Sequence, residues 1–208
     1  ATVFKFYPLV LLLPFLLNQQ RDIGARWGDW RRFTPLAVFA AVCMAVLIVS
    51  LCLSVADTFA PLSYFENRPF QVESSAASVL WLFHFQGYQL SPIMAYGSFS
   101  VLSPLASPLS LINTLLLIAG LAYTYWLQWR GKVDLAASCL LTLLIVIVTG
   151  KVFSPQYLVW LIPLATYVGE RKLKWVVAWC LIGGLTTCIF PYLYQIYLYH
   201  LLHVSDAP

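Results

Sequence analysis

A short run between two apolar segments carries the side chains best suited to chemistry. Residues 151–160 read Lys-Val-Phe-Ser-Pro-Gln-Tyr-Leu-Val-Trp. Lys151 supplies a compact positive charge that can bind a phosphate. Ser154 and Gln156 offer neutral hydrogen bonds suited to hydroxyl groups, and Tyr157 and Trp160 offer flat surfaces for sugars or isoprenoid chains. The run therefore indicates a ligand that is part anion, part polyol and part lipid.

Two further segments combine charged and aromatic residues in a similar way. Residues 5–8 read Lys-Phe-Tyr-Pro and contribute Lys5 and Tyr7. Residues 68–74 read Arg-Pro-Phe-Gln-Val-Glu-Ser and contribute Arg68, Gln71 and Glu73. Arginine binds phosphate through two parallel hydrogen bonds, and the Gln and Glu side chains can orient hydroxyl groups.

The composition excludes most soluble classes of protein. The chain is 61% hydrophobic and only 10% charged, whereas a soluble domain carries about 25% charged residues. An apolar excess of this size predicts an all-α, polytopic membrane helix bundle. The net charge of +4 is small and scattered, so we expect no nucleic-acid partner. The cysteines show no metal-ligand spacing, and we expect neither a metal site nor a cofactor from the residues.

About six apolar runs predict membrane spans. Some of these runs are shorter than the usual length of about 20 residues, which a thinner bilayer can accommodate. Proline lies within the first and the last of them and is expected to kink both helices. The predicted spans are Val3–Leu17, Pro35–Ala56, Leu109–Trp129, Val133–Gly150, Phe153–Val168 and Trp175–Leu202.

The connecting segments alternate in charge. The segments 18–34, 130–132 and 169–174 carry nine of the twelve basic residues, so the positive-inside rule places them in the cytoplasm. The remaining basic residues, Lys5, Arg68 and Lys151, then lie on the extracytoplasmic side. A cation on that side needs a reason, and an anionic ligand above the outer leaflet is a good one.

The long outer segment 57–108 holds most of the remaining polar residues, and a loop of this length is where binding function is expected. Asn67 and Pro69 predict the start of a helix. The mostly apolar residues 72–85 predict that this helix lies along the membrane surface or dips into it, with Glu73 near its positive end. Residues 88–108 are rich in Ser, Gly, Pro and aromatic residues and show little helical pattern.

Structural explanations remain open for each charged candidate. Lys151 can extend its ammonium group to the membrane interface, and Lys5 can anchor the end of a helix. Arg68 can form a surface ion pair with an acidic neighbour, and Glu73 can serve only as a partner of the helix dipole. The residue types alone do not decide between these roles and phosphate binding.

The three segments together resemble a known family. The run 151–160, followed by Ile162-Pro163, is similar to the signature Lys-Val-x-Ser/Thr-x-Gln-Tyr-x-x-Trp of multispanning GT-C glycosyltransferases. It resembles the bacterial polyprenol-phosphate-mannose-dependent mannosyltransferases, of the glycosyltransferase family 87 type. The segments 5–8 and 68–74 resemble the Lys-x-Tyr-Pro and Arg-x-x-Gln-x-Glu-Ser elements, which occur in the same order.

The resemblance implies an enzyme of the cell membrane with its active face outside. It would transfer a hexosyl group, with mannose as the first expectation, from a polyprenyl-phosphate donor to a hydroxyl of a lipid or glycan acceptor. Lys151, Arg68 and Lys5 would bind the donor phosphate. Sugar or acceptor would contact Gln71, Glu73, Ser154, Gln156, Tyr157, Trp160 and Tyr7. The resemblance leaves a divalent-metal requirement open.

One element of the family is absent from these residues. Its expected catalytic base is an Asp in an earlier outer loop, and no such element precedes Lys5. We therefore expect residues 1–208 to be the C-terminal part of a single transmembrane domain, with the base upstream of Ala1. A transporter or flippase of a lipid-linked or anionic substrate is the alternative, and a noncatalytic scaffold is a third.

Overall fold

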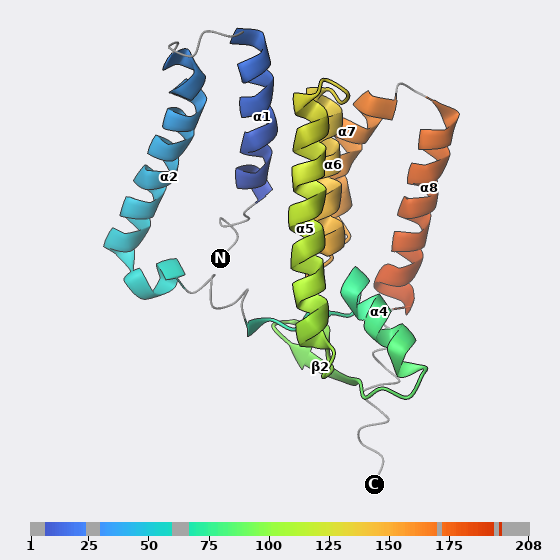
Figure 1. Cartoon of the computed structure of the whole chain (residues 1–208). Helices are drawn as coiled ribbons and strands as arrows, with labels where there is room; N and C mark the ends of the chain where they lie inside the picture. Colours follow the sequence, from blue (N-terminus) through green and yellow to red (C-terminus); the bar gives the residue numbers. More distant parts are fainter. Residues whose placement is uncertain (1–6, 24–29, 60–66, 170–171, 194–195, 197–208) are drawn as a thin grey trace. The chain divides into compact units, whose positions relative to one another are not determined.

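The computed structural model is mostly helical and describes residues 7–23, 30–59, 67–169, 172–193 and 196. It divides into two compact units, Ala1–Phe153 and Ser154–Pro208, and Figure 1 shows the elements of both. The helices of the first unit are α1 (Tyr7–Ile23), η1 (Trp30–Phe33), α2 (Thr34–Leu53), α4 (Ser75–His84), α5 (Ala106–Trp129) and α6 (Leu135–Thr149). Its strands are β1 (Phe70–Gln71), β2 (Ser91–Ala95) and β3 (Ser98–Leu102). The second unit contains α7 (Gln156–Gly169), α8 (Leu173–Thr187) and η2 (Cys188–Leu193).

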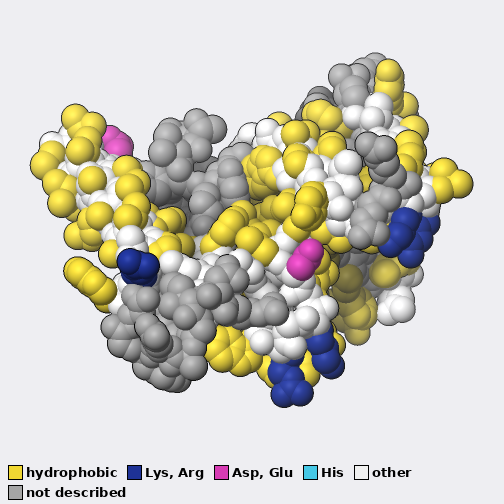
Figure 2. All heavy atoms as spheres, turned by 90° about the horizontal axis from the view of Figure 1, so that it is seen from above, with side chains coloured by type: hydrophobic (Ala, Val, Ile, Leu, Met, Phe, Trp, Pro, Cys, Tyr) yellow, Lys and Arg dark blue, Asp and Glu magenta, His cyan; other side chains and the backbone are white. Residues whose placement is uncertain are grey.

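Three helices are long and apolar enough to cross a membrane: Thr34–Leu53, Ala106–Trp129 and Leu173–Phe190. None of α2 is buried against other parts of the described chain, which suits a helix whose apolar side chains face lipid. Apolar side chains also make up most of the coloured surface in Figure 2. This is the pattern of a multi-pass membrane protein.

The other predicted spans form shorter helices. The first begins at Tyr7 and continues to Ile23, beyond the expected Leu17. Helix α6 has 15 residues and α7 has 14, so each is about 20–23 Å long at 1.5 Å per residue. A hydrocarbon core is about 30 Å thick. The prediction of about six spans is therefore supported at full length only for the three longer helices.

Helices α1, α5 and α6 pack together and share polar contacts. Pro14 lies inside α1 and has no N–H, so the carbonyl of Val10 lacks its usual donor one turn later. The hydroxyl of Tyr125 donates to that carbonyl at 3.1 Å. The Gln128 amide donates to the Pro14 carbonyl at 2.8 Å, and the Ser138 hydroxyl donates back to Gln128 at 2.7 Å. Neighbouring helices thus satisfy main-chain groups that lipid could not.

These contacts also fix the direction of the three helices. Val10 and Pro14 follow the same direction as Tyr125 and Gln128, so α1 and α5 run parallel. Helix α6 runs antiparallel to α5, because its first turn meets Gln128 and its last carbonyl, at Thr149, accepts from Asn113. The C-terminal ends of α1 and α5 therefore lie at one end of this bundle, and residues 150–153 lie at the other. The alternation of charged segments predicts this arrangement.

The outer segment contains a small sheet that the all-α expectation omitted. Strands β1, β3 and β2 lie in that order, with both pairs antiparallel. Residues 98–101 read Ser-Phe-Ser-Val, and this alternation gives β3 one polar and one apolar face. Phe70 pairs with Val101 on the apolar face, and Gln71 pairs with Ser100 on the polar face.

The apolar face of the sheet explains where α4 begins. Phe70 and Val101 are buried with Ala76, Ala77 and Leu80 of α4 in one core cluster. The cap of α4 is Ser74, whose hydroxyl accepts from the Ala77 N–H at 3.2 Å. The prediction that Asn67 begins this helix was wrong. Residues 70–71 are used for β1 instead, because pairing with β3 satisfies their main chain and buries Phe70.

The second unit contains a pair of apolar helices, α7 and α8. Gly169 ends α7, and a Cβ atom there would lie 3.0 Å from Cγ of Trp175 in α8, so the close approach of the helices requires glycine. Helix α8 ends at Thr187, and Phe190 is extended at φ −123° and ψ 119°. The residue before a proline is driven out of the helical region, so Pro191 interrupts the long sixth span as its sequence indicates.

Candidate functional site

The edge of the small sheet joins two of the three segments singled out by sequence. The N–H of Gln71 donates to the Lys151 carbonyl at 2.9 Å, and the N–H of Val72 donates to Phe99 of β3 at 2.9 Å. Successive N–H groups of a strand point to opposite sides, so β1 pairs with β3 on one side and receives residue 151 on the other. Segments far apart in the sequence thus meet within the first unit.

Arg68 lies two residues before β1, and its side chain reaches the neighbouring strand β3. Its Nη2 donates to the Ser98 hydroxyl oxygen at 2.9 Å. Ser98 is only 7% exposed, so this charge-assisted hydrogen bond is shielded from water and is of the stronger kind. We call Arg68, Gln71, Glu73, Ser98 and Lys151 the sheet-edge cluster.

Glu73 is a half-buried carboxyl in this cluster. Burial raises the pKa of the Glu73 carboxyl above its ordinary value, while hydrogen bonds from its own N–H and from the Gln71 side chain, and the charge of Arg68, act in the opposite direction. Oε2 of Glu73 and Oε1 of Gln71 are buried and accept no hydrogen bond from the described residues. Buried acceptors of this kind are costly unless a donor reaches them, and a hydroxyl group would satisfy them.

Of the ten predicted site residues, four lie in the sheet-edge cluster. Arg68, Gln71 and Glu73 come from the outer segment, and Lys151 follows α6. Lys5 lies outside the described residues, and so does the side chain of Tyr7, the first residue of α1. The remaining four belong to the second unit, because the boundary between the units falls between Phe153 and Ser154, inside the run 151–160.

The second part of that run forms the beginning of α7. The Ser154 carbonyl accepts from the Tyr157 N–H at 2.8 Å, which starts the first turn. Gln156 is exposed. The rings of Tyr157 and Trp160 stack with centroids 4.7 Å apart and planes 29° apart. Spacing of three residues places these rings on one face of the helix, where they form a joint aromatic surface.

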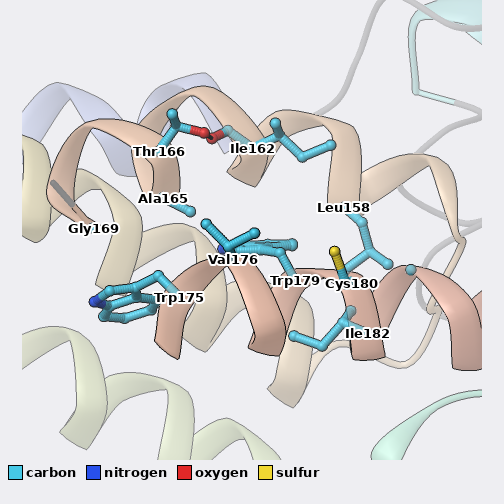
Figure 3. Close-up of a pocket in the computed structure, with 11 residues that line it drawn as sticks. Leu158, Ile162, Ala165, Thr166, Gly169, Trp175, Val176, Trp179, Cys180 and Ile182 are labelled. Carbon is cyan, nitrogen blue, oxygen red and sulfur yellow. Dashed lines mark hydrogen bonds between the residues drawn. The ribbon is translucent and has the colours of Figure 1, made fainter. Parts of the chain in front are cut away.

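An apolar pocket of about 430 Å³ lies between α7 and α8, within the second unit. We call it the α7–α8 pocket, and Figure 3 shows the side chains that line it. Leu158, Ile162 and Trp179 are among these. The Thr166 hydroxyl also lines the pocket, but it donates to the Ile162 carbonyl of its own helix at 2.8 Å. The pocket therefore presents almost no polar group and suits an apolar chain.

The structure adds Ser98 to the site, which sequence reasoning missed. The signal was present, because Tyr96-Gly97 can form a two-residue hairpin turn with glycine and the residues that follow it, 98–101, alternate between polar and apolar. Among the described residues, no group of three or more His, Cys, Asp or Glu side chains could hold a metal ion.

Comparisons with protein-family models, with curated proteins and with solved structures found no match to this chain.

Proposed function

We propose that this chain is part of a multispanning glycosyltransferase that takes a hexosyl group, with mannose the first expectation, from a polyprenyl-phosphate donor. The acceptor is a hydroxyl of a lipid or glycan at the extracytoplasmic face. The observation that carries the proposal is the hydrogen bond from the Gln71 N–H to the Lys151 carbonyl. It brings together, in one unit, the two motif segments that the resemblance assigns to one site.

The chemistry of transfer explains why cations are needed there. The bond between the sugar C1 and the phosphate oxygen breaks, and C1 forms a bond to the acceptor oxygen. The polyprenyl phosphate that leaves carries more negative charge than the donor did. Arg68 and Lys151 stabilise this charge as it develops, which is an effective form of catalysis in a site shielded from water.

The neutral and acidic members of the cluster have a different task. Glu73 and Gln71 each present a buried oxygen suited to a hydroxyl donor, so they orient hydroxyls of the sugar or acceptor. A carboxylate base outside the cluster removes the acceptor proton. In the second unit, the Tyr157 and Trp160 surface packs against the sugar or the isoprenoid chain.

The test is transfer by the full-length protein carrying Lys151→Ala. In liposomes supplied with radiolabelled polyprenyl-phosphate mannose and an acceptor extract, transfer should fall about 100- to 1,000-fold, as when a single charge-stabilising donor is removed. Lys174→Ala, in the first turn of α8, is the matched control and should keep wild-type activity. Near-normal turnover by Lys151→Ala would contradict the phosphate-binding role.

A further inference from the structure

Ser98 has a hydrogen-bonding arrangement that is defined on both sides. Its hydroxyl oxygen accepts from Nη2 of Arg68 at 2.9 Å and donates to the Ala95 carbonyl at 3.4 Å. Because a guanidinium only donates, the hydroxyl oxygen must accept in the Arg68 contact, and the Ala95 carbonyl is the acceptor available to the hydroxyl proton. A hydroxyl oriented in this way is a better acceptor for a cation than one that rotates freely.

The position of Ser98 is set by the hairpin turn directly before it. Tyr96 has φ 54° and Gly97 has φ 70°, so both turn residues lie in the left-handed region. This is the geometry of the tight two-residue hairpin, and a bulky residue such as Tyr pays a conformational cost there. The turn pairs Ala95 with Ser98, so the hairpin sets the position of the Ser98 hydroxyl beside the Ala95 carbonyl.

We propose that Ser98 is a positioning residue that fixes the guanidinium of Arg68 for binding the donor phosphate. This inference rests on the proposed function. A guanidinium has five N–H donors in one plane, so a hydrogen bond at Nη2 determines the plane in which the others lie. A long side chain that is already oriented loses less conformational entropy when the anion binds.

Ser100 provides a comparison on the same face of the same strand. It is fully buried, and its hydroxyl has no hydrogen-bond partner among the described residues. Ser98 and Ser100 are therefore matched in residue type, strand and burial, and they differ in the hydrogen bond that Ser98 accepts from Arg68. Removal of the Ser100 hydroxyl should leave phosphate binding unchanged.

The experiment measures binding of unglycosylated polyprenyl phosphate to the full-length protein in lipid nanodiscs. Ser98→Ala should weaken binding about tenfold, the effect of losing one hydrogen bond to a charged group. Ser98→Thr, which keeps the hydroxyl, should remain within about twofold of wild type. If Ser98→Ala does not fold, Ser98→Cys keeps the volume and gives the same test. In an Arg68→Ala background, Ser98→Ala should cause no further loss, because a positioning residue acts only through its partner.

Wild-type affinity in Ser98→Ala, or a loss in the Arg68→Ala background equal to that in the wild-type background, would overturn this inference and leave the proposed function standing. A loss in Ser100→Ala as large as that in Ser98→Ala would also overturn it, because the effect would then belong to the sheet and not to the Arg68 contact. A wild-type protein that binds no polyprenyl phosphate would overturn the proposed function together with this inference.

Discussion

The sheet-edge cluster is organised by hydrogen bonds, whereas the α7–α8 pocket is formed by apolar packing. The cluster is held together by directional hydrogen bonds. The Gln71 N–H donates to the Lys151 carbonyl, and Nη2 of Arg68 donates to the Ser98 hydroxyl. In the pocket, the walls are apolar side chains, and the closest constraint is the approach of Gly169 to Trp175.

The difference indicates what each region can recognise. Hydrogen bonds fix direction as well as distance, so the cluster can select a charged or hydroxylated group and hold it in one orientation. Apolar packing fixes volume but not direction, so the pocket can accept chains of different length and conformation.

The largest expected effect comes from removing the hydrogen bond that joins the two motif segments. Gln71→Pro removes the N–H that faces Lys151, while the N–H groups that face β3 belong to other residues. Proline is tolerated on an edge strand at such a position. Gln71→Ala loses the same side chain but keeps the N–H. Transfer by Gln71→Pro should fall about 100-fold below that of Gln71→Ala, because a shift of about 1 Å at a site costs that much.

Thermal unfolding of both Gln71 variants controls for loss of the fold. The proline variant should lose no more than about 1–2 kcal/mol relative to the alanine variant, the value of one main-chain hydrogen bond. Equal transfer by the two variants would show that transfer does not require the hydrogen bond between β1 and the Lys151 main chain. The directional hydrogen bonds of the cluster would then not distinguish it functionally from the pocket.

The next effect belongs to the α7–α8 pocket and concerns volume alone. A Cβ atom at Gly169 would meet Cγ of Trp175 at 3.0 Å, whereas one at Gly183 would meet nothing within 4 Å. Gly169→Ala should therefore destabilise the protein by about 1–2 kcal/mol through overpacking. Gly183→Ala, inside α8, should stabilise it by about 0.5–1 kcal/mol through helix propensity. Thermal unfolding in detergent measures both.

A loss of stability in both glycine variants would contradict this account. It would mean that a side chain is as poorly tolerated at Gly183 as at Gly169. The pocket would then be a shaped site like the cluster, and the contrast between direction and volume would fail.

The sequence predicted the helices well, because long apolar runs leave few other structures in a membrane. It also singled out Arg68, Gln71, Glu73 and Lys151, whose residue types are unusual between apolar segments. It missed β1, since two residues give no periodicity of their own and become a strand only by pairing with β3. Ser98 was missed for a different reason: the Tyr96-Gly97 turn can be read from the sequence, but an ordinary serine becomes part of the site only through its contact with Arg68.

The smallest effect, and the sharpest contrast between the two regions, is in pH dependence. Burial raises the pKa of the Glu73 carboxyl above the unfolded value of 4.5. Stability from this group is therefore present in full below pH 4.5 and is lost as the pH rises through the folded pKa. The melting temperature of Glu73→Gln, which does not titrate there, should rise relative to wild type over that interval and then level off.

Thr166→Val in the α7–α8 pocket is the control for this titration. Its hydroxyl is bonded within its own helix, and neither side chain titrates, so its difference from wild type should stay constant with pH. If the difference for Glu73→Gln were also constant, the hydrogen bonds to Glu73 and the charge of Arg68 would cancel the effect of burial on its pKa. The carboxyl would then serve as a permanent counter-charge to Arg68, and sugar or acceptor hydroxyls would have to be oriented by Gln71.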